Sequence, residues 1–111
     1  MPTVNFFYQN DAHLKRLDEL MQDIKTLVAS ELSCGDIQLD TSEVSVRLIR
    51  SEGSGMIADL EVEITAHAFQ ERVDKQDKIC LRTRDYLVQK IPKTEIRVWL
   101  LLPQLGHSWE E

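Results

Sequence analysis

The chain has 111 residues, 13 of them basic and 19 acidic, and its formal net charge at pH 7 is −6. This length suits one ordinary domain, expected over residues 1–111, with a core large enough to fold without disulfide bonds or a structural metal. An acidic chain without a cluster of lysine and arginine lacks the surface that binds phosphates, which excludes nucleic acid as a partner.

The sequence also lacks the patterns of a secreted or membrane-inserted chain. It contains no signal-peptide pattern and no apolar segment of about 18 residues. Cys34 and Cys80 lie far apart, with no further cysteine or histidine at zinc-ligand spacing. We therefore expect a soluble, cytoplasmic protein with reduced thiols and without a membrane partner.

The first predicted elements are a strand and a long helix. Residues 3–8, "TVNFFY", are rich in β-branched and aromatic side chains, which predicts a strand. Asn10 or Asp11 then suits the N-cap of a helix. Apolar residues recur at steps of three and four over about 12–33, which predicts one amphipathic helix, and Gly35 is a stop signal.

Two strands, a second helix and a last strand follow. The segments "VSVRLIR" (44–50) and "GMIADLEVEITA" (55–66) both alternate between apolar and polar residues, which is typical of strands. The glycine-containing loop "SEGSG" lies between them, so we expect a β-hairpin. A helix over about 69–90 comes next, and Pro92 ends it before the strand "EIRVWLLL".

This order predicts an α+β fold in which two β-α-β units form a four-stranded mixed sheet with two helices on one face. Successive side chains of a strand point to opposite faces of the sheet. One face is apolar, and both helices must cover it. Its residues are Val4, Phe6, Tyr8, Val44, Val46, Leu48, Leu60, Val62, Ile64, Ile96, Val98 and Leu100.

The opposite face, called the open face below, mixes charged and apolar side chains. Its arginines and carboxylates have opposite signs and can pair across strands. Such a face suits a subunit interface with matched charges, and the alternative is a face that is merely solvated. Its residues are Asn5, Phe7, Ser45, Arg47, Ile49, Asp59, Glu61, Glu63, Thr65, Arg97, Trp99 and Leu101.

The first two residues, Met1 and Pro2, allow two interpretations. Proline has no N–H and is tolerated as the first residue of a strand, which is a purely structural role. A methionine before a small residue is usually removed, however, and its removal leaves Pro2 with a free secondary amine. A free prolyl amine can act as a base.

These features together resemble the tautomerase superfamily, which includes 4-oxalocrotonate tautomerase and macrophage migration inhibitory factor. "MP" opens a strand, two β-α-β units follow, and "SVRLIRSE" (45–52) is similar to the second strand of 4-oxalocrotonate tautomerase. The length, the glycine-bearing loop and the tail "GHSW" look more like macrophage migration inhibitory factor. The resemblance implies the tautomerase fold, a homotrimer with active sites between neighbouring subunits, and no cofactor or metal.

The resemblance also implies a reaction and the residues that perform it. In this family the N-terminal proline takes a proton from a carbon next to a carbonyl and returns it elsewhere, which makes Pro2 the catalytic base of an isomerase. Arg47 matches the arginine of "SVR" that binds the substrate carboxylate, so the expected substrate is a small carboxylated enol or keto acid. The alternative for Arg47 is a salt bridge with Glu61 or Glu63.

Two residues of the last strand are candidates for substrate binding. Arg97 lies about where macrophage migration inhibitory factor has a pocket tyrosine, and it can supply a second cation from the adjacent subunit or form a structural ion pair. Trp99 can form an apolar pocket wall or pack at an interface. A further large aromatic residue, Trp109, is expected to dock the tail on its own or a neighbouring subunit.

The sequence departs from the family at two points. The arginine that follows the first strand of 4-oxalocrotonate tautomerase has no counterpart in "YQNDAH", and the lysine before the second strand of macrophage migration inhibitory factor falls in an acidic loop here. The substrate class therefore stays open. Two alternatives without catalysis also stay open: a trimeric scaffold, and a ferredoxin-like binding module, in which the third strand lies between the first and second.

Overall fold

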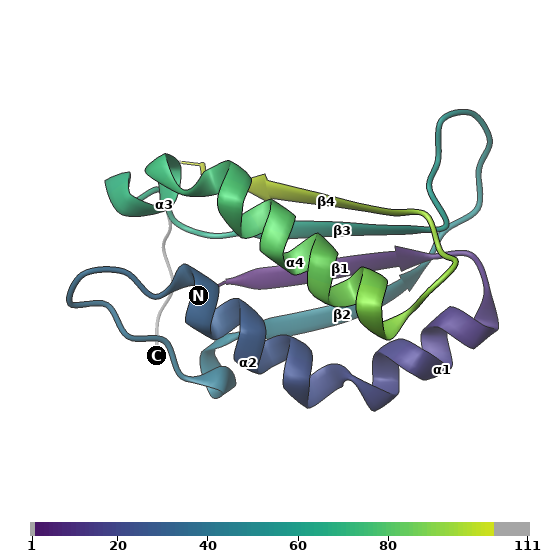
Figure 1. The fold of residues 1–111 in the computed structure, drawn as a ribbon, viewed down its shortest axis with the longest axis horizontal. Coiled ribbons are helices and arrows are strands. Elements are labelled where there is room, and N and C mark those ends of the chain that lie inside the picture. Colours follow the sequence, from purple (N-terminus) through teal and green to yellow (C-terminus); the bar gives the residue numbers. More distant parts are fainter. Residues whose placement is uncertain (1, 104–111) are drawn as a thin grey trace, which may run out of the picture.

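The computed structural model describes residues 2–103, so the expected docking of Trp109 lies outside the described residues. Four strands form one sheet in the order β2-β1-β3-β4 (Figure 1). Neighbours β1 and β2 are parallel, as are β3 and β4, whereas β1 and β3 are antiparallel. The predicted four-stranded mixed sheet of two β-α-β units is confirmed. The strands are β1 (Thr3–Tyr8), β2 (Ser45–Arg50), β3 (Leu60–Thr65) and β4 (Ile96–Leu101).

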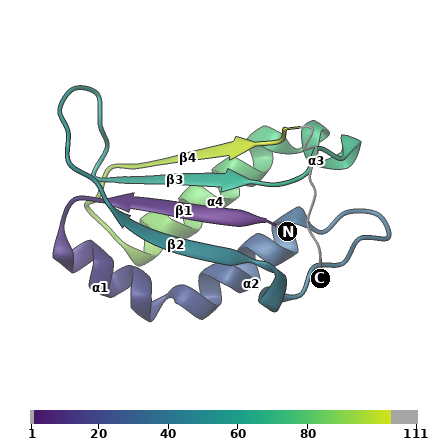
Figure 2. The ribbon, with the colours of Figure 1, turned by 180° about the vertical axis from the view of Figure 1, so that it is seen from behind.

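The predicted hairpin between the second and third strands is wrong. Strand β1 lies between β2 and β3, so residues 51–59 cross the end of β1 instead of turning between neighbours (Figure 2). The ferredoxin-like arrangement is excluded as well, because β1 pairs directly with β2. Alternation and a glycine-containing loop are local signals, and they do not specify which strand pairs with which.

The two helical segments were predicted in the right places, but each is interrupted by one residue. The first consists of α1 (Asp11–Glu19) and α2 (Met21–Leu32), with Leu20 between them at φ −92° and ψ 0°. The N-cap of α1 is Asn10, whose side chain accepts a hydrogen bond of 2.8 Å from an amide of the first turn. Leu20, which follows α1 and precedes α2 in the chain, is buried. The apolar stripe therefore continues through the break, and its periodicity gives no sign that the helix is interrupted.

The second helical segment consists of α3 (Gln70–Asp74) and α4 (Gln76–Lys90), with Lys75 between them. A short 3₁₀ helix, η1 (Thr41–Glu43), precedes β2. No helix in the described part of the chain is long and apolar enough to span a membrane.

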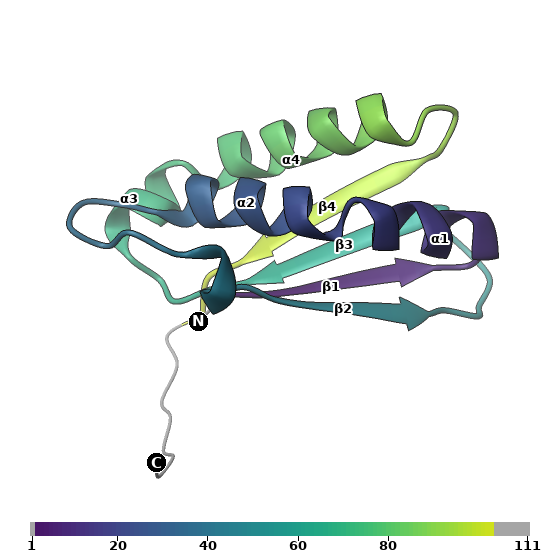
Figure 3. The same ribbon diagram turned by 90° about the horizontal axis from the view of Figure 1, so that it is seen from below.

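In the described part of the chain, the helices lie together on one face of the sheet and none covers the other face (Figure 3). The even-numbered side chains of β1 and β3 point into the core between the two layers, and the odd-numbered ones lie on the open face. The predicted division into an apolar and an open face is therefore confirmed. The largest side chains of this core that are fully buried are Phe6, Leu17, Leu32, Leu60, Ile64 and Leu87.

Helix α4 also protects the free edge of β4. Gln76 donates a hydrogen bond of 2.8 Å to the carbonyl of Leu100, and Arg84 donates one of 3.4 Å to the carbonyl of Ile96. These carbonyls point away from β3, so they have no partner in the sheet. Side chains that cover an edge strand in this way reduce the risk that it pairs with another chain.

A buried arginine connects the two β-α-β units at the end where α2 stops. Arg72 is 4% exposed, and its guanidinium donates hydrogen bonds of 2.9 Å to the carbonyls of Leu32 and His67. It also lies over the ring of Phe69, 4.7 Å from the centroid. Burial lowers the pKa of this guanidinium, partly offset by the nearby Cys34.

Candidate active site

The strand register arranges the open face in rows that run across the sheet. Asn5 lies opposite Arg47 on one side and Glu63 on the other, and Glu63 lies opposite Trp99. Because neighbouring strands are about 4.8 Å apart, Arg47 and Trp99 are about 14 Å apart at the two ends of this row. The next row consists of Ile49, Phe7, Glu61 and Arg97.

Pro2 lies at the beginning of β1 with its side chain fully buried. Its carbonyl accepts a hydrogen bond of 3.0 Å from the amide of Ser45, which joins it to the first residue of β2. Thr3 pairs with Ser45 and Asn5 with Arg47, so the Cα atoms of Pro2 and Arg47 are about 11 Å apart. Pro2 and Arg47 thus lie towards the same end of the β1–β2 pair, about three residues apart along the strands.

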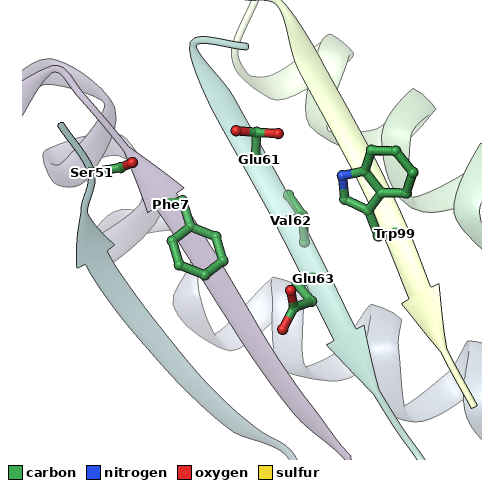
Figure 4. A pocket seen from close by; sticks show the side chains of 6 residues that line it. All are labelled: Phe7, Ser51, Glu61, Val62, Glu63 and Trp99. Atoms are coloured by element: carbon green, nitrogen blue, oxygen red, sulfur yellow. The ribbon is translucent and has the colours of Figure 1, made fainter. Parts of the chain in front are cut away.

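A pocket of about 260 Å³ is hollowed into the open face further along the strands. Two glutamates of β3 lie in it between the rings of Phe7 on β1 and Trp99 on β4 (Figure 4). Trp99 is 53% exposed. The residues that line the pocket are Phe7, Ser51, Glu61, Val62, Glu63 and Trp99.

Within one chain, the four predicted site residues do not come together. Of these four, only Trp99 lines the pocket, and Pro2 lies about 17 Å from Phe7 along β1. Arg97 shares β4 with Trp99, whereas Arg47 is on the opposite edge strand, β2. A site that uses all four residues needs contributions from more than one copy of the chain.

Arg97 forms a structural ion pair, which is one of its two expected roles, whereas the salt bridge expected as an alternative for Arg47 is not found within residues 2–103. Arg97 lies opposite Glu61 in the register, yet its guanidinium donates a hydrogen bond of 2.7 Å to the carbonyl of Met56 and pairs with Glu95 at 3.2 Å. Arg97 therefore serves as a structural contact to the loop 51–59 in this chain. Arg47 forms no ion pair with Glu61 or Glu63 within residues 2–103.

The pocket itself could not be predicted from the sequence. Alternation put Phe7, Glu61, Glu63 and Trp99 on the same face, but only the strand order brings β1, β3 and β4 side by side. A hairpin would place β2 next to β3, and the side chains of the open face would then have different neighbours. No pattern in the sequence pointed to Ser51, because it lies in the loop after β2.

Metal and thiol chemistry find no support among the described residues. No group of three or more histidine, cysteine, aspartate or glutamate side chains in that part of the chain is arranged to hold a metal ion. Cys34 and Cys80 are both free. Burial raises the pKa of the Cys80 thiol, which keeps it in its unreactive protonated form.

The fold is shared with several solved structures. A protein of unknown function from Vibrio cholerae matches with a TM-score of 0.71 at 15% identity, over 99% of this chain and 84% of that one. A macrophage migration inhibitory factor-like protein from Entamoeba histolytica matches with a TM-score of 0.68 at 14% identity, over 96% and 95%. A 5-carboxymethyl-2-hydroxymuconate isomerase from Deinococcus radiodurans matches with a TM-score of 0.59 at 14% identity, over 99% and 88%.

No protein-family model matches the sequence, and no curated protein matches it. The likeness is therefore one of structure, and at 14–15% identity it concerns the fold alone. The chain shares its fold with these solved structures, which include a macrophage migration inhibitory factor-like protein and an isomerase, and this is the fold that its resemblance to the tautomerase superfamily predicted.

Proposed function

We propose that this protein is a cofactor-independent tautomerase. In the proposed reaction the amine of Pro2, freed by removal of Met1, is the general base for keto–enol tautomerisation of a small carboxylated enol. The observation that carries the proposal is the position of Pro2, which directly precedes β1 with its side chain buried and its carbonyl accepting a hydrogen bond from the amide of Ser45. One protein of the same fold is a 5-carboxymethyl-2-hydroxymuconate isomerase.

The proposed chemistry needs only a neutral amine and a cation. The amine takes a proton from a carbon next to the carbonyl and returns it at another atom of the same substrate. Burial disfavours the charged ammonium form, so an amine beside an apolar side chain gives up its proton more readily than one in water. The Arg47 guanidinium binds the substrate carboxylate and stabilises the negative charge of the dienolate as it forms.

We further propose that the site is assembled between subunits of a homotrimer. Arg97 and Trp99 lie too far from Pro2 to meet the same small molecule within one chain, so in this proposal they come from the adjacent subunit. The open face supports association, because it exposes large apolar side chains beside its charges. Trp99 is 53% exposed and Leu101 is 48% exposed.

The test is an enol assay on untagged protein with and without Met1. Protein whose intact mass shows removal of Met1 is expected to ketonise phenylenolpyruvate or 2-hydroxymuconate faster than buffer does. Protein that retains Met1 has an amide nitrogen at Pro2 and is expected to be inactive. Equal activity of the two forms excludes Pro2 as the base, and no activity on either enol from an associated, trimmed protein favours a non-catalytic scaffold.

A further inference from the structure

Three charged side chains of the open face lack a partner among the described residues. Arg47 is exposed on β2, whereas Glu61 and Glu63 are half-buried on β3. None of the three forms an ion pair within residues 2–103. Arg97 does not neutralise the glutamates, because its guanidinium is occupied by the loop 51–59 and by Glu95.

Strand β1 separates these charges within one chain. Asn5 lies between Arg47 and Glu63 in the register, so their Cα atoms are about 10 Å apart, two strand spacings. The side-chain oxygen of Asn5 is buried and has no hydrogen-bond donor among the described residues. Arg47 lies exposed on β2, an edge strand of the sheet, where its side chain can reach a neighbouring molecule.

The pocket around the two glutamates has the chemistry of a guanidinium site. Glu61 and Glu63 supply carboxylate oxygens, and the rings of Phe7 and Trp99 flank them on β1 and β4 (Figure 4). Carboxylates form short, charge-assisted hydrogen bonds with arginine, and aromatic faces attract the same cation. Its volume of about 260 Å³ is enough for one side chain.

We propose that Arg47 of one copy docks between Glu61 and Glu63 of a second copy. This inference rests on the self-association in the proposed function. Burying this face without matching its charges is costly, and Arg47 is the one cation of the four strands' open face that is not already engaged within residues 2–103. Its charge is complementary to that of the pocket. The occupant of the pocket is thus a second copy of this chain.

This pairing makes the interface head-to-tail. The β2 side of one copy meets the β3–β4 side of the next, and contacts between unlike surfaces close into rings when the rotation allows. The guanidinium has five N–H donors, so Arg47 can bind the glutamates and still offer a donor to a substrate carboxylate. The subunit boundary and the proposed substrate site then share one residue.

A charge swap tests the pairing by sedimentation velocity over a range of protein concentrations. Arg47→Glu is expected to raise the dissociation constant of the assembly by at least about 30-fold. The introduced carboxylate would be repelled by the carboxylates of Glu61 and Glu63 of the second copy. The double variant Arg47→Glu, Glu63→Arg restores the opposite charges and is expected to recover association to within about fivefold of the parent. Circular dichroism of each variant checks that it is folded.

The matched control is Lys78→Glu, which changes the net charge by the same amount at an exposed position of α4. It is expected to associate like the parent. If folded Arg47→Glu associates like the parent, or the double variant stays as dissociated as the single one, the pairing is overturned. A parent protein that is monomeric at tens of micromolar overturns the association itself, whereas the enol assay tests the chemistry separately.

Discussion

The amide of Ser45 donates a hydrogen bond of 3.0 Å to the carbonyl of Pro2, so the residue before β1 is already held by the sheet. While Met1 is attached, the nitrogen of Pro2 is an amide without an N–H and takes no part in the ladder; removal of Met1 turns it into a secondary amine with a basic lone pair. Backbone pairing thus fixes the position of Pro2 through its carbonyl and leaves its nitrogen free of the sheet. This arrangement is suited to a base that must stay in place while its lone pair acts.

The first prediction concerns that lone pair. Pro2→Ala, with Met1 removed, is expected to lower kcat/KM for phenylenolpyruvate about 10- to 100-fold without abolishing it, because a primary amine remains. In the parent, kcat/KM is expected to rise with pH as one group loses its proton. Stopped-flow or absorbance assays between pH 5 and 9 measure both effects. A Pro2→Ala profile identical to that of the parent contradicts the prediction.

The second prediction concerns the buried guanidinium of Arg72. Arg72→Met is expected to lower the free energy of unfolding by about 2 kcal/mol, because the carbonyls of Leu32 and His67 lose their donors in a buried place. Urea unfolding followed by circular dichroism measures the change. The control is Arg82→Met, which removes a surface ion pair with Glu31 and is expected to cost less than about 1 kcal/mol. Equal costs for the two variants contradict the prediction.

The third prediction concerns the free edge of β4. Gln76→Ala removes the donor of the 2.8 Å hydrogen bond to Leu100 and is expected to lower the free energy of unfolding by about 1 kcal/mol. Gln89→Ala, at an exposed position of the same helix, makes the same chemical change and is expected to be nearly neutral. Thermal unfolding of both variants beside the parent measures the difference, and a Gln89→Ala variant as unstable as Gln76→Ala argues against the edge contact.

The fourth prediction concerns pH and Cys80. Burial, and to a lesser extent Asp77, raises the pKa of the Cys80 thiol in the folded protein, with a smaller opposing effect from a backbone hydrogen bond of Leu100. The unfolded chain releases this proton near the ordinary thiol pKa of about 8.5. The neutral thiol of Cys80 therefore makes its full contribution to the free energy of unfolding below that pH. This contribution is lost as the pH rises through the pKa of the thiol in the folded protein.

Cys80→Ala removes this titration along with the side chain. The difference in unfolding free energy between parent and Cys80→Ala is expected to be largest at pH 7 and to shrink towards pH 10. Urea unfolding at several pH values measures it. Ile79→Val, on the same helix and without a titrating group, serves as the control, and its cost is expected to stay constant. A cost of Cys80→Ala that does not change with pH contradicts the assignment.

Local patterns of the sequence predicted the elements and their faces. Alternation in Thr3–Tyr8 and Leu60–Thr65 reports which side chains are buried, because a strand has a period of two residues. Asn10 as a candidate cap and Pro92 as a stop marked the limits of helices in the same local way. The breaks in the helices at Leu20 and Lys75 could not be predicted, because neither a glycine nor a proline marks them.

The sequence by itself thus determined four strands, two helical segments and an open face that carries Phe7, Glu63 and Trp99. Only the tertiary structure decided that β1 lies between β2 and β3, which separates Arg47 from the glutamates and gathers Glu61 and Glu63 between two aromatic rings. The reason is physical. Periodicity along a chain records whether a side chain faces the core, whereas strand order depends on contacts between residues that are distant in sequence, and those leave no periodic trace.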